Sequence, residues 1–333
     1  SLMFLDTSSN MAMQPFKMMV GDMVNEEQKT KAYSIQSFLC NAGSLVGYLF
    51  PIILTSWLLI PNEAEAGKVP DTVIYSFYAG AAILILCVLY TTLKVKEYPP
   101  ALYNEYHGVE QQPAETKSPS IVRLLIDAPS TFWTIGLVQF FCWAAFMFMW
   151  TYTNGAVAAN AFDAPTVVRE GSVVLDTTSK AYNMAGNWVG VLFAVQAVGS
   201  VLWAMVIPLF KNRKMIYALS LVLGGIGFIS ILFVSNQYVL FGSYLLVGCA
   251  WAAMLAMPFT ILTNSLKGGH MGTYLGLFNG TICLPQIIAA IMGGVILNLF
   301  TTPGQLAPEV NMLALAGVLL LAGAACVAFI REK

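Results

Sequence analysis

Charged residues are scarce in this chain, and their scarcity excludes an ordinary soluble domain. Only 10% of the 333 residues are charged, 16 Lys and Arg against 17 Asp and Glu, whereas soluble domains carry about 25%. The net charge of −1 provides no basic surface, so we expect no nucleic-acid partner. Hydrophobic residues make up 58% of the chain, which indicates an integral membrane protein.

Motifs for metal, redox and diphosphate chemistry are also missing. None of the six cysteines belongs to a CxxC pair, and all lie in apolar runs, where they are best interpreted as small packing residues. An intramembrane prenyltransferase is the enzyme alternative, but it needs clustered aspartates for Mg²⁺–diphosphate, and the chain has no DxxxD motif. We therefore predict no enzyme activity, no cofactor and no metal site.

Apolar runs of bilayer length follow one another along the chain. A helix needs about 20 apolar residues to cross a bilayer, and nine such segments predict an all-α membrane protein. The first, residues 1–23, is polar enough that an interfacial amphipathic helix is the alternative. The other eight lie near residues 33–60, 72–93, 131–153, 182–209, 215–235, 238–263, 272–300 and 310–330.

Basic residues are distributed unevenly between the two sets of predicted loops, and cytoplasmic loops are the richer in Lys and Arg. One set holds three: Lys68, Arg169 and Lys180. The other holds twelve: Lys29, Lys31, Lys94, Lys96, Lys117, Arg123, Lys211, Arg213, Lys214, Lys267, Arg331 and Lys333. This bias predicts a multi-pass protein of the cell (inner or plasma) membrane with a cytoplasmic C-terminus. Nine spans then place Ser1 outside, so we expect further spans upstream.

A polar, proline-rich connection separates the spans into two groups. It contains YPPALYNEYHGVEQQPAETKSPS, a linker composition, and ends in the short amphipathic segment IVRLLI. We predict three spans in residues 1–93, a cytoplasmic linker over 94–128 and a six-helix bundle over 129–333. In the outer loop, VVREGSVVL predicts a small β-hairpin.

Three spans, a linker and six spans resemble a twelve-span major facilitator without its first three helices. The first segment is similar to the fourth span of the glycoside–pentoside–hexuronide group, in its sucrose and maltose proton-symporter branch. The matching residues are Leu5-Asp6, Asn10, Gln14-Pro15, Lys17 and Asp22. Plant sucrose transporters have Arg where this chain has Lys17, which keeps the charge but not the bidentate fork.

Three later segments carry the same resemblance. Residues 137–152 resemble the seventh span, 185–190 the eighth, and 272–286, with GTYLGLFN followed by ICLPQ, the eleventh. The resemblance implies a two-bundle fold holding the fourth to twelfth spans, a central sugar cavity and sugar–H⁺ symport by alternating access. The expected partners are a disaccharide such as an α-glucoside, H⁺ (or Na⁺) and the lipid bilayer, with the protein monomeric.

The first segment provides the candidate coupling residues. Asp6 and Lys17 are eleven residues apart, which places them on one side of a helix, roughly 16 Å apart along its axis. Asp6 is the candidate proton-coupling carboxylate, because burial and a nearby cation shift its proton affinity in opposite directions. The alternatives are a static buried ion pair for Asp6 and snorkelling for Lys17. Asp22 is a candidate gate residue, or else a solvated surface charge.

Candidate sugar ligands come from three segments. Asn10 shares the stripe of Asp6, and Gln139 and Trp143 lie one turn apart in the span near 131–153. Asn279 and Gln286 share a face seven residues apart. Amides suit sugar hydroxyls and an indole suits the apolar face of a sugar ring. Interhelical hydrogen bonds, interfacial aromatics and a packed Gln are the structural alternatives.

Competing functions remain open at this point. An uncoupled sugar facilitator or exporter, and a Na⁺-coupled glycoside symporter, fit the same residues. A non-transporting sugar sensor on the same fold is a further alternative.

Overall fold

The computed structural model describes residues 8, 12, 16, 19, 23, 24, 26–61, 69–96, 120–169, 171–265 and 271–330. The chain divides into two compact units. The larger unit is formed by Ser1–Leu49 together with Pro129–Lys333, and the smaller is Phe50–Ala128.

Helices account for nearly all of the regular structure. Eight helical segments are long and apolar enough to cross a membrane, and they coincide with the eight spans predicted after residue 32. The predicted first span, and with it the total of nine, lies outside the described residues. The helices are α2 (Glu26–Leu58), α3 (Asp71–Lys94), α5 (Ile121–Ile126), α6 (Ser130–Ala161), α7 (Lys180–Val206), α8 (Arg213–Ile231), α9 (Leu240–Ser265), α10 (Met271–Phe278), α11 (Gly280–Phe300) and α12 (Glu309–Cys326), with 3₁₀ turns η1 (Ile207–Leu209) and η2 (Val327–Phe329).

The smaller unit contains α3 and α5. Thr72 is the one buried residue within α3, so nearly all of its apolar side chains are exposed, as suits a helix surrounded by lipid. The predicted short helix IVRLLI is confirmed as α5, which buries Leu124 and carries an Arg123–Asp127 ion pair of 3.6 Å at its exposed end.

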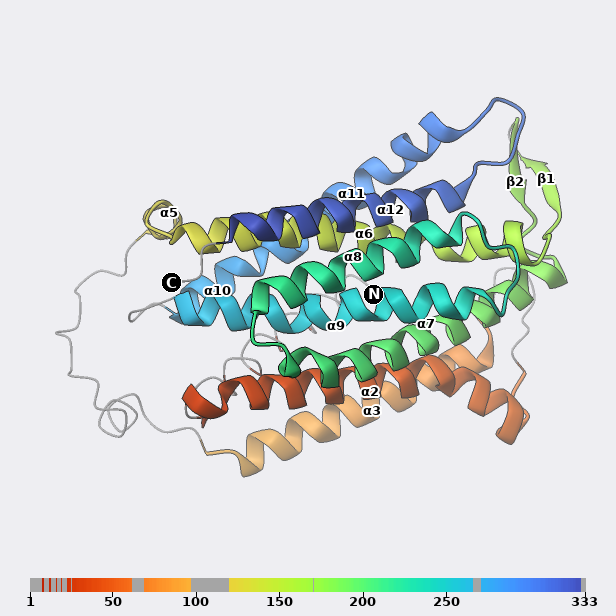
Figure 1. Cartoon of the computed structure of the whole chain (residues 1–333). Coiled ribbons are helices and arrows are strands. Elements are labelled where there is room, and N and C mark those ends of the chain that lie inside the picture. The colour runs from red at the N-terminus through yellow and green to blue at the C-terminus, as the bar shows by residue number, and fades with distance from the viewer. Residues whose placement is uncertain are drawn as a thin grey trace, which may run out of the picture. The chain divides into compact units, whose positions relative to one another are not determined.

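In the larger unit, α6, α7, α8 and α9 run in alternating directions, α10 continues into α11 in one direction, and α12 returns (Figure 1). Helix α6 is the centre of this unit, because α7, α9, α11 and α12 all pack against it. It outlasts the predicted span by eight residues and ends at Ala161, where Asp163 takes a positive φ of 46° and the Ala164 amide donates to Ala158. This end of the unit also holds the hairpin and the start of α12, and we call it the hairpin end (Figure 1).

The predicted β-hairpin is confirmed between α6 and α7. Strands β1 (Thr166–Arg169) and β2 (Ser172–Leu175) pair antiparallel, and Gly171 in the turn takes a φ of 79°, which glycine adopts without strain. Asp176 follows β2 and accepts hydrogen bonds from the hydroxyl and the amide of Thr178 at 2.6 and 3.0 Å, which lower the pKa of its carboxyl. These bonds position the start of α7.

Glycines bring the helices of the larger unit into close contact. A Cβ on Gly227 of α8 would lie 2.6 Å from the Ser243 carbonyl oxygen of α9. Between α8 and α12, a Cβ on Gly317 would lie 2.7 Å from the Gly225 carbonyl oxygen. Small residues at such crossings let helix backbones approach, which is how membrane helices gain packing energy in the absence of a hydrophobic driving force.

Replacing Gly227 should therefore destabilise the larger unit. In Gly227→Ala the new methyl group meets backbone, which cannot rotate away, and overpacking of this kind costs about 1–3 kcal/mol. We expect a lower Tm for thermal unfolding in detergent. Gly242→Ala is the matched control, because its Cβ would have no neighbour within 4 Å. Equal Tm values for the two variants would contradict the close α8–α9 packing.

Candidate functional site

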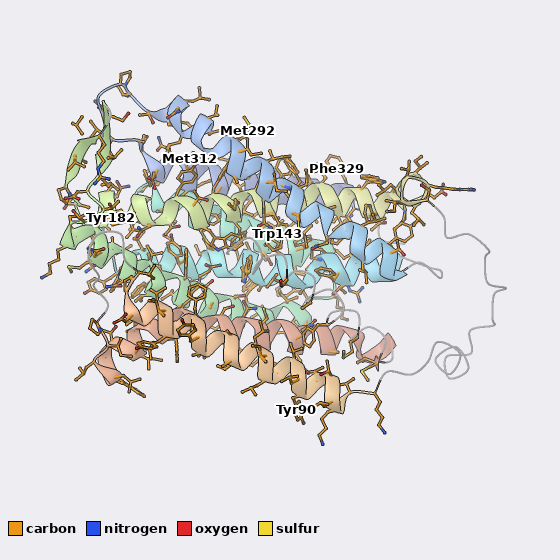
Figure 2. The ribbon with its side chains drawn as sticks, turned by 180° about the vertical axis from the view of Figure 1, so that it is seen from behind. Tyr90, Trp143, Tyr182, Met292, Met312 and Phe329 are labelled. Carbon is orange, nitrogen blue, oxygen red and sulfur yellow. The ribbon has the colours of Figure 1, made fainter. Side chains whose placement is uncertain are left out.

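Four aromatic side chains of α6 and α9 form a cluster inside the larger unit. We call Trp143, Phe146, Trp150 and Trp251 the aromatic cluster. The Trp251 ring of α9 is the common neighbour, with centroid distances of 5.8 Å to Trp143, 4.9 Å to Phe146 and 5.8 Å to Trp150. Figure 2 shows Trp143 near the middle of the helices, away from both ends. The predicted aromatic platform on α6 is thus joined by a tryptophan from a second helix.

The amide of Gln139 is buried next to this cluster without a hydrogen bond. Gln139 lies one turn before Trp143 on α6, and its exposed fraction is 0%. Neither Oε1 nor Nε2 has a hydrogen-bond partner within the part of the chain that the structure describes, and the same holds for the Trp143 indole Nε1. A buried polar group left unpaired costs about 1–3 kcal/mol. A bound ligand that formed hydrogen bonds with these three atoms would remove that cost.

Asn279 contributes a third orphaned group at the junction of two consecutive helices. It separates α10 from α11, and its Oδ1 is buried and accepts no hydrogen bond in the described structure. Its side chain does not cap α11 either. Two residues further on Thr281 begins the turn before Pro285, which has no N–H to donate to the Thr281 carbonyl. The helix is therefore weakened where this polar side chain enters the interior.

The segments that carry Gln139 and Asn279 meet where α6 crosses α10–α11. Phe132 of α6 contacts Phe278 of α10 at a centroid distance of 5.8 Å. A Cβ on Gly136 would lie 3.1 Å from the Thr281 methyl group. Gln139 follows Gly136 by one turn, so its amide lies near this crossing. Asn279 lies at the same level of the helices but two residues from Thr281, so its side chain leaves α10–α11 on a different side.

Helices α6, α9, α10 and α11 contain no Asp, Glu, Lys, Arg or His. The site thus offers amide donors and acceptors, an indole N–H and aromatic faces in surroundings without formal charge. Such a set suits a neutral ligand with both hydroxyl groups and apolar faces, because rings pack on the faces and amides pair with the hydroxyls. It does not suit a metal ion, which needs anionic or several oxygen ligands.

Of the remaining predicted site residues, the structure describes only Gln286. Gln286 donates from Nε2 to the Ile282 carbonyl at 3.2 Å within its own helix, so this donor is already used. Asp6, Asn10, Lys17 and Asp22 lie outside the described residues, and their roles stay predictions.

Three interior residues were not predicted from the sequence. Trp251 completes the aromatic cluster. The sequence signal for it is its position in the middle of an apolar run, because tryptophans of membrane proteins usually lie near the interfaces. Asn41 of α2 accepts a hydrogen bond of 3.0 Å from Ser200 of α7, and both are buried. One turn before Ser200, Gln196 is 5% exposed and its Oε1 has no partner among the described residues.

No protein-family model matches this chain, and no curated protein matches it. The chemistry of the buried amides and rings therefore has to carry the functional argument.

Removing the orphaned amide should stabilise the protein. In Gln139→Leu an apolar side chain of similar volume replaces two unpaired polar atoms, so we expect the free energy of unfolding to rise by about 1–3 kcal/mol. Thermal unfolding in detergent measures this as a higher Tm. Gln286→Leu is the control, because its amide already bonds to Ile282, and its Tm should not rise. A lower Tm for Gln139→Leu would mean that the Gln139 amide is satisfied.

Proposed function

We propose that this chain is part of a secondary transporter, a sugar–H⁺ symporter of the major facilitator type that works by alternating access. The observation that carries the proposal is the pair of orphaned groups on Gln139 and Trp143 inside an uncharged helix interior. Eight apolar helices of spanning length support the membrane setting. A disaccharide such as an α-glucoside is the proposed substrate.

The aromatic cluster and the amides would share the work of binding. A sugar ring has apolar C–H faces that pack on indole rings, and its hydroxyl groups can donate to the Oε1 and accept from the Nε2 of Gln139. Asn279 would add an acceptor from α10–α11. Because the unpaired groups raise the free energy of the empty site, part of the binding energy comes from satisfying them. Such a site favours a ligand of defined hydroxyl geometry over a purely apolar one.

Proton coupling is assigned to the first segment. Asp6 would bind and release the proton, and Lys17 would couple to it through substrate, water or a neighbouring helix, since about 16 Å is too far for direct contact. Asn10 would bind a sugar hydroxyl, and Asp22 would contribute to an inner gate. The hairpin end would face outward and the C-terminus the cytoplasm, as the basic loops indicate. The prolines Pro258 and Pro285 provide places where α9 and α11 can bend as access alternates.

Transport by the chain in proteoliposomes tests the proposal. Uptake of radiolabelled maltose and sucrose is measured together with a lumenal pH dye. We expect sugar entry to acidify the lumen, and Asp6→Asn to abolish the acidification. Uptake without acidification in the wild type would leave a facilitator and contradict symport, and dependence on Na⁺ would favour the glycoside–Na⁺ alternative.

A matched pair of tryptophan variants tests the site itself. Trp143→Ala removes an indole of the aromatic cluster, and the loss of one stacked ring should weaken sugar binding by roughly 10-fold, or about 1–1.5 kcal/mol. Trp133→Ala removes an exposed indole from the same helix (53% exposed) and should leave binding unchanged. Isothermal calorimetry of the purified chain measures both. Equal losses, or no loss in either variant, would contradict a sugar site at the aromatic cluster.

A further inference from the structure

Glu309 is a carboxylate at a helix contact that the proposed sugar site does not use. It is the first residue of α12 and is partly buried at the hairpin end. Its carboxylate lies against Gly155 of α6, so closely that a Cβ on Gly155 would collide with both carboxylate oxygens. Glycine at position 155 therefore leaves the space that this carboxylate occupies.

A tyrosine extends this contact to a third helix. Tyr152 lies almost one turn before Gly155 on α6, is 8% exposed, and interacts electrostatically with Glu309. On its other side a Cβ on Gly293 of α11 would lie 2.5 Å from the Tyr152 hydroxyl oxygen. Two glycines thus shape the contacts by which Glu309 and Tyr152 join α6, α11 and α12 at the hairpin end.

The carboxylate has no cation to compensate its charge among the described residues. On α6 the titratable neighbour is Tyr152, and α11 contains no charged residue. The charged residues of α8, which packs on α12, are Arg213 and Lys214 in its first turn, at the opposite end. In the hairpin, Arg169 interacts with Asp176 instead.

Two opposite effects act on the charge of Glu309. The first turn of α12 lies at the positive end of the helix dipole, which favours the ionised carboxylate. The contact with an apolar helix inside a membrane favours the protonated form. While the carboxyl group lies against α6 the second effect operates, and wherever water reaches the carboxyl group the first prevails.

We propose that Glu309 is a proton-binding group at the hairpin end, protonated while its carboxyl group lies against Gly155 and ionised when water reaches that carboxyl group. The proton comes from water at the hairpin end and returns there. This site is separate from the aromatic cluster, and its existence does not depend on which sugar is carried.

Infrared difference spectroscopy of the full chain in lipid, between acidic and alkaline buffer, tests the proposal. A protonated carboxyl group has a C=O stretching band that disappears on ionisation. We expect one such band to be absent in Glu309→Gln and shifted in Gly155→Ala, where the methyl group displaces the carboxyl group. Gly294→Ala, whose Cβ would have no neighbour within 4 Å, is the matched glycine control and should keep the wild-type band.

Further variants and a functional readout keep the test decisive. Tyr152→Phe should retain a carboxyl band, which separates Glu309 from the tyrosine signal. If Gly155→Ala does not fold, Glu309→Gln alone decides the assignment of the band. An identical band in the wild type and Glu309→Gln, or a Glu309 group that stays in one protonation state across the pH range, would overturn the proposal. Sugar binding at constant pH should survive in Glu309→Gln, so failure of this proposal is distinct from failure of the sugar site.

Discussion

The structure depends most on one constraint, which is that a polar atom buried between apolar helices needs a hydrogen bond or a function. Most buried polar side chains have a hydrogen bond. Ser220, for example, donates to the Ile216 carbonyl at 2.6 Å and accepts from the Trp203 indole at 2.8 Å. The Gln139 amide and the Trp143 indole have none within the described part of the chain. A site that keeps two such groups unpaired gives up stability, which is the pattern expected where a ligand completes the hydrogen bonds.

Close packing elsewhere makes this exception possible. Glycines at the α7–α9, α8–α9 and α8–α12 crossings bring the backbones together, so those helices form a rigid support behind α6. Along its length, α6 contacts a different set of helices in each of three segments. Phe132 and Gly136 meet α10–α11, Trp143 and Phe146 meet Trp251 of α9, and Tyr152 and Gly155 meet α11 and α12.

Sequence patterns alone predicted the helices, the hairpin and α5, because apolar length and local turn chemistry are properties of neighbouring residues. They also indicated Gln139, Trp143 and Asn279, since polar and aromatic side chains stand out in an apolar run. Trp251 and Glu309 were not predicted as functional residues, because the side chains that they contact lie far away in the sequence. Glu309 looks like an ordinary loop charge until Gly155, more than 150 residues earlier, is found beside it.

The most direct test of the account is the protection of the tryptophans of the aromatic cluster by sugar. Quenching of intrinsic fluorescence by acrylamide is measured for the full chain with and without a saturating disaccharide, in a background where the exposed Trp57 and Trp133 are replaced by Phe. The account predicts that sugar reduces quenching in this background and that Gln139→Leu abolishes the reduction. Unchanged quenching with every sugar tested, or protection that persists in Gln139→Leu, would contradict the assignment of this site.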